Sequence, residues 1–128
     1  LKLPADHQRP KIQTYHGAEY HFSIDRDLKE KLGMMSQKNG TSLFIPLLTA
    51  FGVLLSRYSL QDDFVVGVPV AKRNHFELES LIGVLINSLP IRFGFSEETT
   101  FTEAMRMTKQ KFFSAFENQE LPFERLVE

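Results

Sequence analysis

The stretch from Ser42 to Ser59 constrains the fold of this chain more than any other, because it is long and almost wholly apolar. About 18 residues of helix span roughly 27 Å, close to the thickness of a bilayer core. Arg57 and the polar flanks argue against a membrane span. We therefore expect a core helix that is buried on nearly all sides and capped by Thr41 or Ser42. Its apolar residues are Leu43, Phe44, Leu47, Leu48, Phe51, Leu54, Leu55 and Tyr58.

The segment before this helix predicts a strand followed by a shorter helix. Alternation over Ala18 to Ile24 is typical of a half-buried strand. Asp25 can cap a helix whose apolar face holds Leu28, Leu32 and Met35, and Asn39-Gly40 can end it. Residues 1 to 16, with Pro4 and Pro10, are expected to form an extended linker.

The segment after it predicts two strands and two helices. Asp63 to Ala71 is Val-rich without polar alternation, which favours an interior strand that is covered on both faces and ends at Pro69. Lys72 to Ser80 is expected to be a loop with one helical turn near Leu78, and Val84 to Phe95 a second strand. Thr100 and Glu103 form a capping box that opens an amphipathic helix, with Lys109 available to face solvent. Pro122 ends that pattern, and a further helix is expected from Phe123.

Composition excludes several classes of function. The 128 residues suit one α/β domain, and 15 basic against 16 acidic residues give no basic surface for nucleic acid. There is no cysteine and no secretory signal, so we expect a cytoplasmic protein. The sequence contains no GxSxG motif of a hydrolase nucleophile and no GxxxxGK[ST] or GxGxxG motif of a nucleotide site. The adjacent carboxylates of Asp62 and Asp63 are expected to lie in a turn rather than to share acid–base work. No metal site is expected, because none of the four histidines has a partner at ligand spacing; these are His7, His16, His21 and His75.

Two segments carry the clearest functional pattern. Residues 82 to 92 read IGVLINSLPIR, and residues 118 to 124 read NQELPFE. They resemble the fifth and sixth core motifs of nonribosomal peptide synthetase condensation domains, approximately IGxFVNTxxxR and HQDxPFE. Leu85 and Ser88 replace Phe and Thr, and Asn118 and Glu120 are conservative exchanges. Residues 13–17, 58–63 and 67–74 also look like the family, so the resemblance covers the whole chain.

The resemblance implies the fold and the reaction. Condensation domains consist of two chloramphenicol-acetyltransferase-like lobes with the active site in a tunnel between them. Carrier proteins deliver substrates on phosphopantetheine, and an acceptor amine attacks a donor thioester near an HHxxxDG histidine. This sequence contains no HHxxxDG. The resemblance therefore implies that residues 17–128 form an α/β C-terminal lobe, in which helices pack against a mixed sheet. This lobe is expected to be incomplete at its C-terminus, and residues 1–16 are expected to link it to a missing N-terminal lobe. We expect this piece alone to be inactive.

The resemblance also implies the site residues, none of which is catalytic. Asn87 is expected at the tunnel and lobe interface, although it could instead satisfy backbone groups at a strand irregularity. Arg92 could reach across the lobes or be a solvated strand residue. Gly67, Pro69 and Arg73 match the loop that floors the tunnel, although tight helix–strand packing also explains Gly67. The remaining motif residues are expected to be structural: Gly83, Gln119, Pro122 and Phe123.

The implied partners are the N-terminal lobe, upstream and downstream peptidyl carrier proteins and an adenylation domain, with no cofactor bound directly and no nucleic acid or membrane.

Three alternatives to a condensation domain stay open. An epimerization domain shares the fold, but we expect an aromatic-rich segment there in place of residues 86–88. A CoA- or carrier-dependent acyltransferase of the superfamily has no need of NQELPFE. A noncatalytic interaction module would have an unrelated α/β fold. The sequence leaves open which substrates are joined.

Overall fold

The computed structural model describes residues 1–8, 10–12, 14–73 and 76–128. Within these ranges the chain forms five helices and one two-stranded sheet. His75, one of the four histidines for which no metal site is expected, falls outside the described residues. The elements are α1 (Arg26–Lys38), α2 (Phe44–Ser59), β1 (Asp63–Ala71), α3 (Phe76–Glu79), β2 (Ile86–Gly94), α4 (Phe101–Glu117) and α5 (Phe123–Val127).

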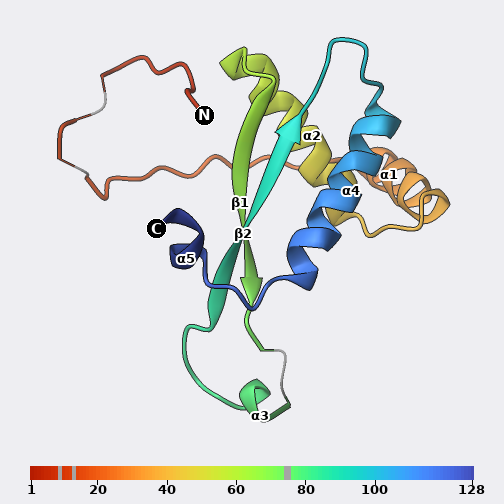
Figure 1. The fold of residues 1–128 in the computed structure, drawn as a ribbon. Coiled ribbons are helices and arrows are strands. Elements are labelled where there is room, and N and C mark those ends of the chain that lie inside the picture. The colour runs from red at the N-terminus through yellow and green to blue at the C-terminus, as the bar shows by residue number, and fades with distance from the viewer. Residues whose placement is uncertain (9, 13, 74–75) are drawn as a thin grey trace.

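The sheet pairs β1 with β2 antiparallel, from Asp63 opposite Gly94 to Ala71 opposite Ile86. Helices α2 and α4 lie against one face of it (Figure 1). The α/β class is confirmed, but the sheet seen in the described residues is antiparallel rather than mixed. The core between helices and sheet is formed by Leu48, Leu55, Phe64, Val68, Leu89, Ile91 and Phe93.

The expectation that β1 is covered on both faces is wrong. Its burial alternates: Phe64 and Val68 are buried, whereas Val65 on the opposite face is 51% exposed. The strand also continues past Pro69 to Ala71. Pro69 and Pro90 both lie within the sheet, which is possible because each strand of a two-stranded sheet has an unpaired edge.

The expectation that α2 is buried on nearly all sides is also wrong. Ile45, Leu48, Gly52 and Leu55 face the core, but a second apolar face of the helix lies open. The helix begins one residue after Leu43, whose side chain makes no capping hydrogen bond, so neither Thr41 nor Ser42 is its N-cap. The reason is that residues Ser42 and Leu43 already belong to the turn leading into α2, since Ile45 N–H donates to the Ser42 carbonyl.

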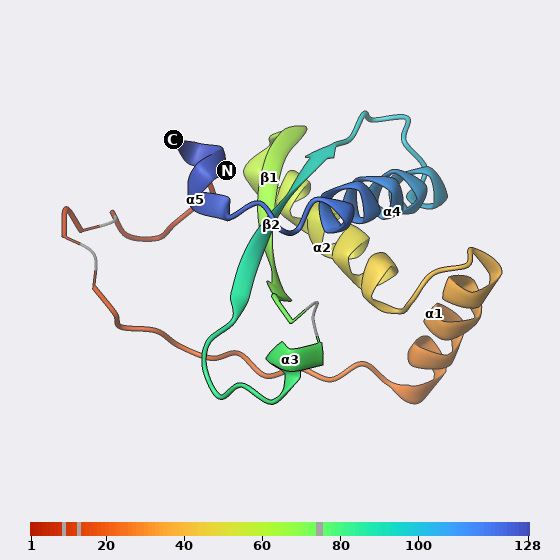
Figure 2. The same ribbon diagram turned by 60° about the horizontal axis from the view of Figure 1, so that its bottom comes forward.

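No strand forms over residues 18–24, where the chain runs extended into α1 (Figure 2). The side chains of Tyr20 and Phe22 stay exposed there. The alternation there is compatible with a strand, but no neighbouring strand pairs with it in the described chain. The expected start of α1 is confirmed, because the Asp25 side chain accepts a hydrogen bond from Leu28 N–H at 2.7 Å. Gly40, with φ +57°, supplies the left-handed residue after the helix.

Helix α4 opens with the predicted capping box of Thr100 and Glu103, and α5 begins after Pro122 as predicted. Lys109, which was expected to face solvent, is half-buried. Its ammonium donates to the carbonyls of Asn39 and Gly40, at 3.1 and 2.8 Å, and so stabilises the C-terminal end of α1. No helix in the described part of the chain is long and apolar enough to cross a membrane.

Candidate functional site

Asn87 lies at the start of β2, opposite Val70, on the sheet face that carries the core. Only 7% of its surface is exposed, so its amide is a polar group among largely apolar neighbours. Such a group destabilises the fold unless it is fully hydrogen-bonded. The partners it finds are all backbone groups.

The Asn87 side chain makes four hydrogen bonds. Its Nδ2 donates to the carbonyls of Gln119 and Leu121, at 2.7 and 2.9 Å. Its Oδ1 accepts from Ser88 N–H at 2.9 Å and from Phe123 N–H at 3.1 Å. A primary amide has two donor hydrogens and two acceptor lone pairs, so every one of them is used.

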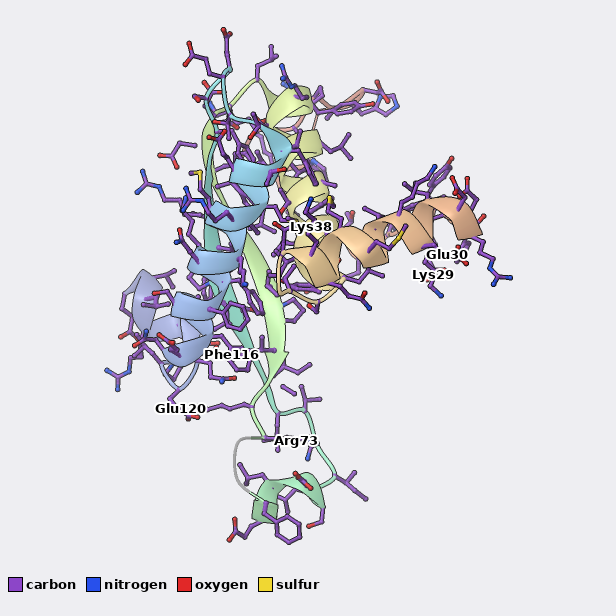
Figure 3. The ribbon with its side chains drawn as sticks, turned by 90° about the vertical axis from the view of Figure 1, so that its right-hand side faces the viewer. Lys29, Glu30, Lys38, Arg73, Phe116 and Glu120 are labelled. Atoms are coloured by element: carbon purple, nitrogen blue, oxygen red, sulfur yellow. The ribbon has the colours of Figure 1, made fainter. Side chains whose placement is uncertain are left out.

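Three of these bonds join the two motif segments that the sequence singled out. Gln119 and Leu121 belong to the connection between α4 and α5, and Phe123 is the first residue of α5, whereas Asn87 belongs to β2, 32 to 36 residues earlier. Lys72 adds a weaker contact, with its ammonium 3.4 Å from the Glu120 carbonyl. Figure 3 shows Glu120 at this connection, below the end of α4 marked by Phe116. In this chain Asn87 therefore acts as a clamp between β2 and the α4–α5 connection.

This geometry is the alternative that the sequence left open, in which Asn87 satisfies backbone groups. The four bonds leave no free hydrogen-bonding group on the amide for a substrate. In the described chain, Asn87 can thus influence a nearby reaction by holding backbone in place rather than by touching the reacting atoms. Whether it borders a tunnel stays a prediction.

Arg73 organises the loop that joins β1 to β2. Its guanidinium donates to the carbonyls of Leu78, Leu81 and Gly83, the last two at 2.8 and 3.2 Å. The five N–H groups of a guanidinium suit three carbonyls better than a single ammonium does. Figure 3 shows Arg73 just above α3, at the end of the hairpin. Gly83 takes part in this network through its carbonyl. The position has space for a side chain, because a Cβ on Gly83 would meet nothing within 4 Å.

Gly67, Pro69 and Arg92 lie on the sheet face opposite to Asn87. Gly67 is exposed and a Cβ there would meet nothing within 4 Å, so the alternative of tight helix–strand packing is wrong in this structure. The structure therefore does not bring the five interface residues to one point. Asn87 is on the core face, Gly67, Pro69 and Arg92 are on the open face, and Arg73 is in the loop.

Arg92 has a partner within the sheet. Its Nε and one terminal nitrogen donate to the two carboxylate oxygens of Asp63, at 2.7 and 2.6 Å. The hydrogen bond from Arg92 lowers the pKa of Asp63 below its ordinary value of 3.8. The same bond raises the pKa of Arg92. Asp63 begins β1, where the predicted strand from Asp63 to Ala71 starts, so the turn expected for Asp62-Asp63 does not extend over it. Its carboxylate forms a two-bonded ion pair with Arg92 across the strands.

The other motif residues lie between the end of α4 and the start of α5. Pro122 is the N-cap of α5, and Phe123 is its first residue. The Oε1 of Gln119 is buried and makes no hydrogen bond to the described residues.

Elsewhere, a pocket of about 340 Å³ lies between α2 and the start of α4, lined among others by Val53, Arg57 and Phe101. The described residues contain no group of three or more His, Asp or Glu placed to hold a metal ion.

Comparison with known proteins decides what these two joined segments belong to. A family model described as the condensation domain matches residues 1–128. The chain belongs to the condensation-domain family. It is 47% identical over 128 residues to a linear gramicidin synthase of Brevibacillus parabrevis and 41% identical to gramicidin S synthase 2 of Brevibacillus brevis. Each match covers 100% of this chain but only 2% and 3% of those relatives.

Solved structures agree with this membership. The condensation domain of the monacolin K polyketide synthase MokA matches 80% of this chain with a TM-score of 0.75 and 29% identity. The chain aligns with 24% of that structure. A four-domain nonribosomal peptide synthetase, holo-AB3403, matches 98% of the chain and 10% of its own length with a TM-score of 0.93. At 24% identity this second likeness shows the fold alone.

Proposed function

We propose that this chain forms one part of a condensation domain that joins two carrier-bound substrates through an amide bond in nonribosomal peptide synthesis. In this reaction the acceptor amine forms a bond to the donor carbonyl carbon, the bond from that carbon to sulfur breaks, and the amine proton ends on the released thiol. The thiols belong to phosphopantetheine arms of peptidyl carrier proteins, and an adenylation domain loads them. Nothing in the cysteine-free sequence opposes the cytoplasm as the place of this reaction.

The observation that carries the proposal is the clamp formed by Asn87. The two motifs that indicate a condensation domain are separated by 25 residues, yet the structure joins them through one buried side chain. A reaction between two delivered substrates depends mainly on orientation, since well-oriented groups gain about 7–11 kcal/mol over free encounter. A fixed backbone at the lobe interface supports that orientation. We assign Asn87 as a positioning residue.

We further propose that the chemical residues lie outside these 128 positions. The sequence holds no HHxxxDG, and the hydrogen bonds of the Asn87 side chain to the described residues are all made to backbone groups. The reactive imidazole then belongs to an N-terminal lobe that packs against this one. In this arrangement Gly67, Pro69 and Arg92 face the shared tunnel from the open side of the sheet.

The experiment compares the 128-residue chain with the complete condensation domain that contains it. Both are mixed with a carrier protein loaded with a donor aminoacyl thioester and a second carrier loaded with an acceptor. We expect the dipeptidyl-carrier product only from the complete domain. Product from the 128-residue chain alone would contradict the assignment of the chemistry to another lobe. Failure of the complete domain with several donor and acceptor pairs would contradict the proposed reaction.

A further inference from the structure

Helix α2 carries a row of large apolar side chains that stay partly exposed in the described chain, although the Phe44 ring at one end also packs against Phe112 of α4 at a centroid distance of 5.2 Å. The five members are Phe44, Leu47, Phe51, Leu54 and Tyr58, with exposed fractions of 42, 39, 48, 50 and 65%. We call them the α2 stripe. Only Arg57 is charged in the whole helix, so the stripe has no polar member except the Tyr58 hydroxyl.

The spacing of the α2 stripe is that of a packing surface. Its members are separated by three, four, three and four residues, which places them along one side of the helix. That 3–4 alternation is the pattern by which one helix packs against another apolar element. From Phe44 to Tyr58 the stripe is about 21 Å long. Isolated exposed leucines need no explanation, but a continuous row of this length indicates an interaction surface.

The opposite side of α2 is already used. Leu48 and Leu55 pack into the core with the sheet, and a Cβ on Gly52 would stand 2.6 Å from the Phe93 ring. The α2 stripe therefore lies on the side of the helix away from the core, and beyond Phe44, which meets Phe112, its side chains stay open in the described chain.

We propose that the α2 stripe is an internal packing surface of the complete condensation domain, covered by an apolar face of a segment outside these 128 residues. The proportions of solved relatives support this occupant: the aligned part is 24% of the MokA domain, which leaves about three quarters of such a domain available to cover it. A second copy of the chain is less well supported. Self-pairing helices use charged flanking residues to set register and partner, and α2 has only Arg57.

This inference rests on the proposed function only in assuming a larger domain, and its test needs no catalysis. Hydroxyl-radical labelling followed by mass spectrometry is applied to the complete condensation domain and to the 128-residue chain. Phe93, at 2% exposure, is the protected reference in both samples. We expect Phe51 and Tyr58 to be labelled strongly in the 128-residue chain and to lose that labelling in the complete domain. Strong labelling of both residues in the complete domain would overturn the proposal.

Two neighbouring leucines give a matched pair of variants. Leu54 belongs to the α2 stripe, whereas Leu55 is buried at 9% exposure. We expect Leu54→Lys to leave the Tm of the 128-residue chain unchanged but to lower that of the complete domain, whereas Leu55→Lys lowers both. An unchanged Tm of the complete domain with Leu54→Lys would overturn the proposal. So would sedimentation showing a dimer of the 128-residue chain that Leu54→Lys dissociates, because the occupant would then be a second copy.

Discussion

Gly52 of α2 faces the ring of Phe93 on β2 so closely that a Cβ on Gly52 would stand 2.6 Å from Cε1 of the ring. Phe93 is 2% exposed and stacks with Phe64 at a centroid distance of 5.5 Å, so the ring has little room to withdraw. The absence of a side chain at Gly52 is therefore what allows α2 to approach the sheet.

We predict that Gly52→Ala lowers the free energy of unfolding by about 1–3 kcal/mol, because the added methyl group overpacks the core. Gly33→Ala is the matched control, since Gly33 is also inside a helix but a Cβ there would meet nothing within 4 Å. That variant should gain about 0.5–1 kcal/mol from helix propensity. Urea unfolding of both variants checks the prediction. Equal stability changes in the two variants would contradict it.

Arg73 offers a second prediction, because one guanidinium holds three carbonyls of the β1–β2 loop. Arg73→Lys keeps the charge but replaces two separate donor nitrogens by a single one, which is poorly placed to reach all three carbonyls, so we expect a local loss of about 1–2 kcal/mol. Hydrogen exchange of residues 78–83 should become faster, while exchange in α4 should stay unchanged. Arg57→Lys serves as the control substitution. Unchanged exchange of the loop in Arg73→Lys would show that these bonds do not order it.

Acid should weaken the fold through two carboxylates. Arg92 lowers the pKa of Asp63, and hydrogen bonds from the backbone and side chain of Thr100 lower the pKa of Glu103. A folded-state pKa below the unfolded one means that the contribution is present above the unfolded pKa and is lost as pH falls through the folded pKa. We predict that the free energy of unfolding falls below about pH 4, and that Asp63→Asn combined with Glu103→Gln makes this fall shallower. Urea titrations from pH 2 to 7 measure both slopes, and identical slopes would contradict the prediction.

The sequence predicted the features that depend on neighbouring residues. The Asp25 cap, the stop at Asn39-Gly40, the Thr100–Glu103 box and the start of α5 after Pro122 are all local, and all are confirmed. These features involve hydrogen bonds within three or four residues, so the sequence alone shows both partners.

The features that were wrong depend on what a segment meets in space. A strand at Ala18 to Ile24 needs a neighbouring strand, and full burial of α2 needs a second layer over the α2 stripe. Hydrophobic patterning shows that a face is apolar but not which element covers it. The role of Lys109 at the end of α1 was missed for the same reason, since its partners are about 70 residues away.

Three of the four partners of the Asn87 side chain were not predictable from local pattern either, because they are backbone groups 32 to 36 residues away. A backbone group carries no sequence signal. The one available hint was the joint presence of the motifs IGVLINSLPIR and NQELPFE, which the structure explains as two sides of one contact.

Loss of this contact should affect both stability and activity. We predict that Asn87→Ala lowers the free energy of unfolding by about 2–4 kcal/mol, because it leaves several partly buried backbone groups unpaired. In the complete condensation domain, the rate of amide-bond formation should fall by about 100-fold if the α4–α5 connection shifts. Asn118→Ala is the matched control, since that amide donates only locally, to the Ser114 carbonyl. Equal rates for the two variants would contradict a positioning role.

Hydrogen exchange at a single backbone amide tests the clamp most directly. Phe123 N–H donates to Oδ1 of Asn87, so its exchange rate reports whether β2 holds the α4–α5 connection. In Asn87→Ala, measured by NMR under conditions where the protein remains folded, we predict that the Phe123 amide exchanges many times faster, while in Asn118→Ala it keeps its original rate. An unchanged rate at Phe123 in the folded Asn87→Ala variant would contradict the account.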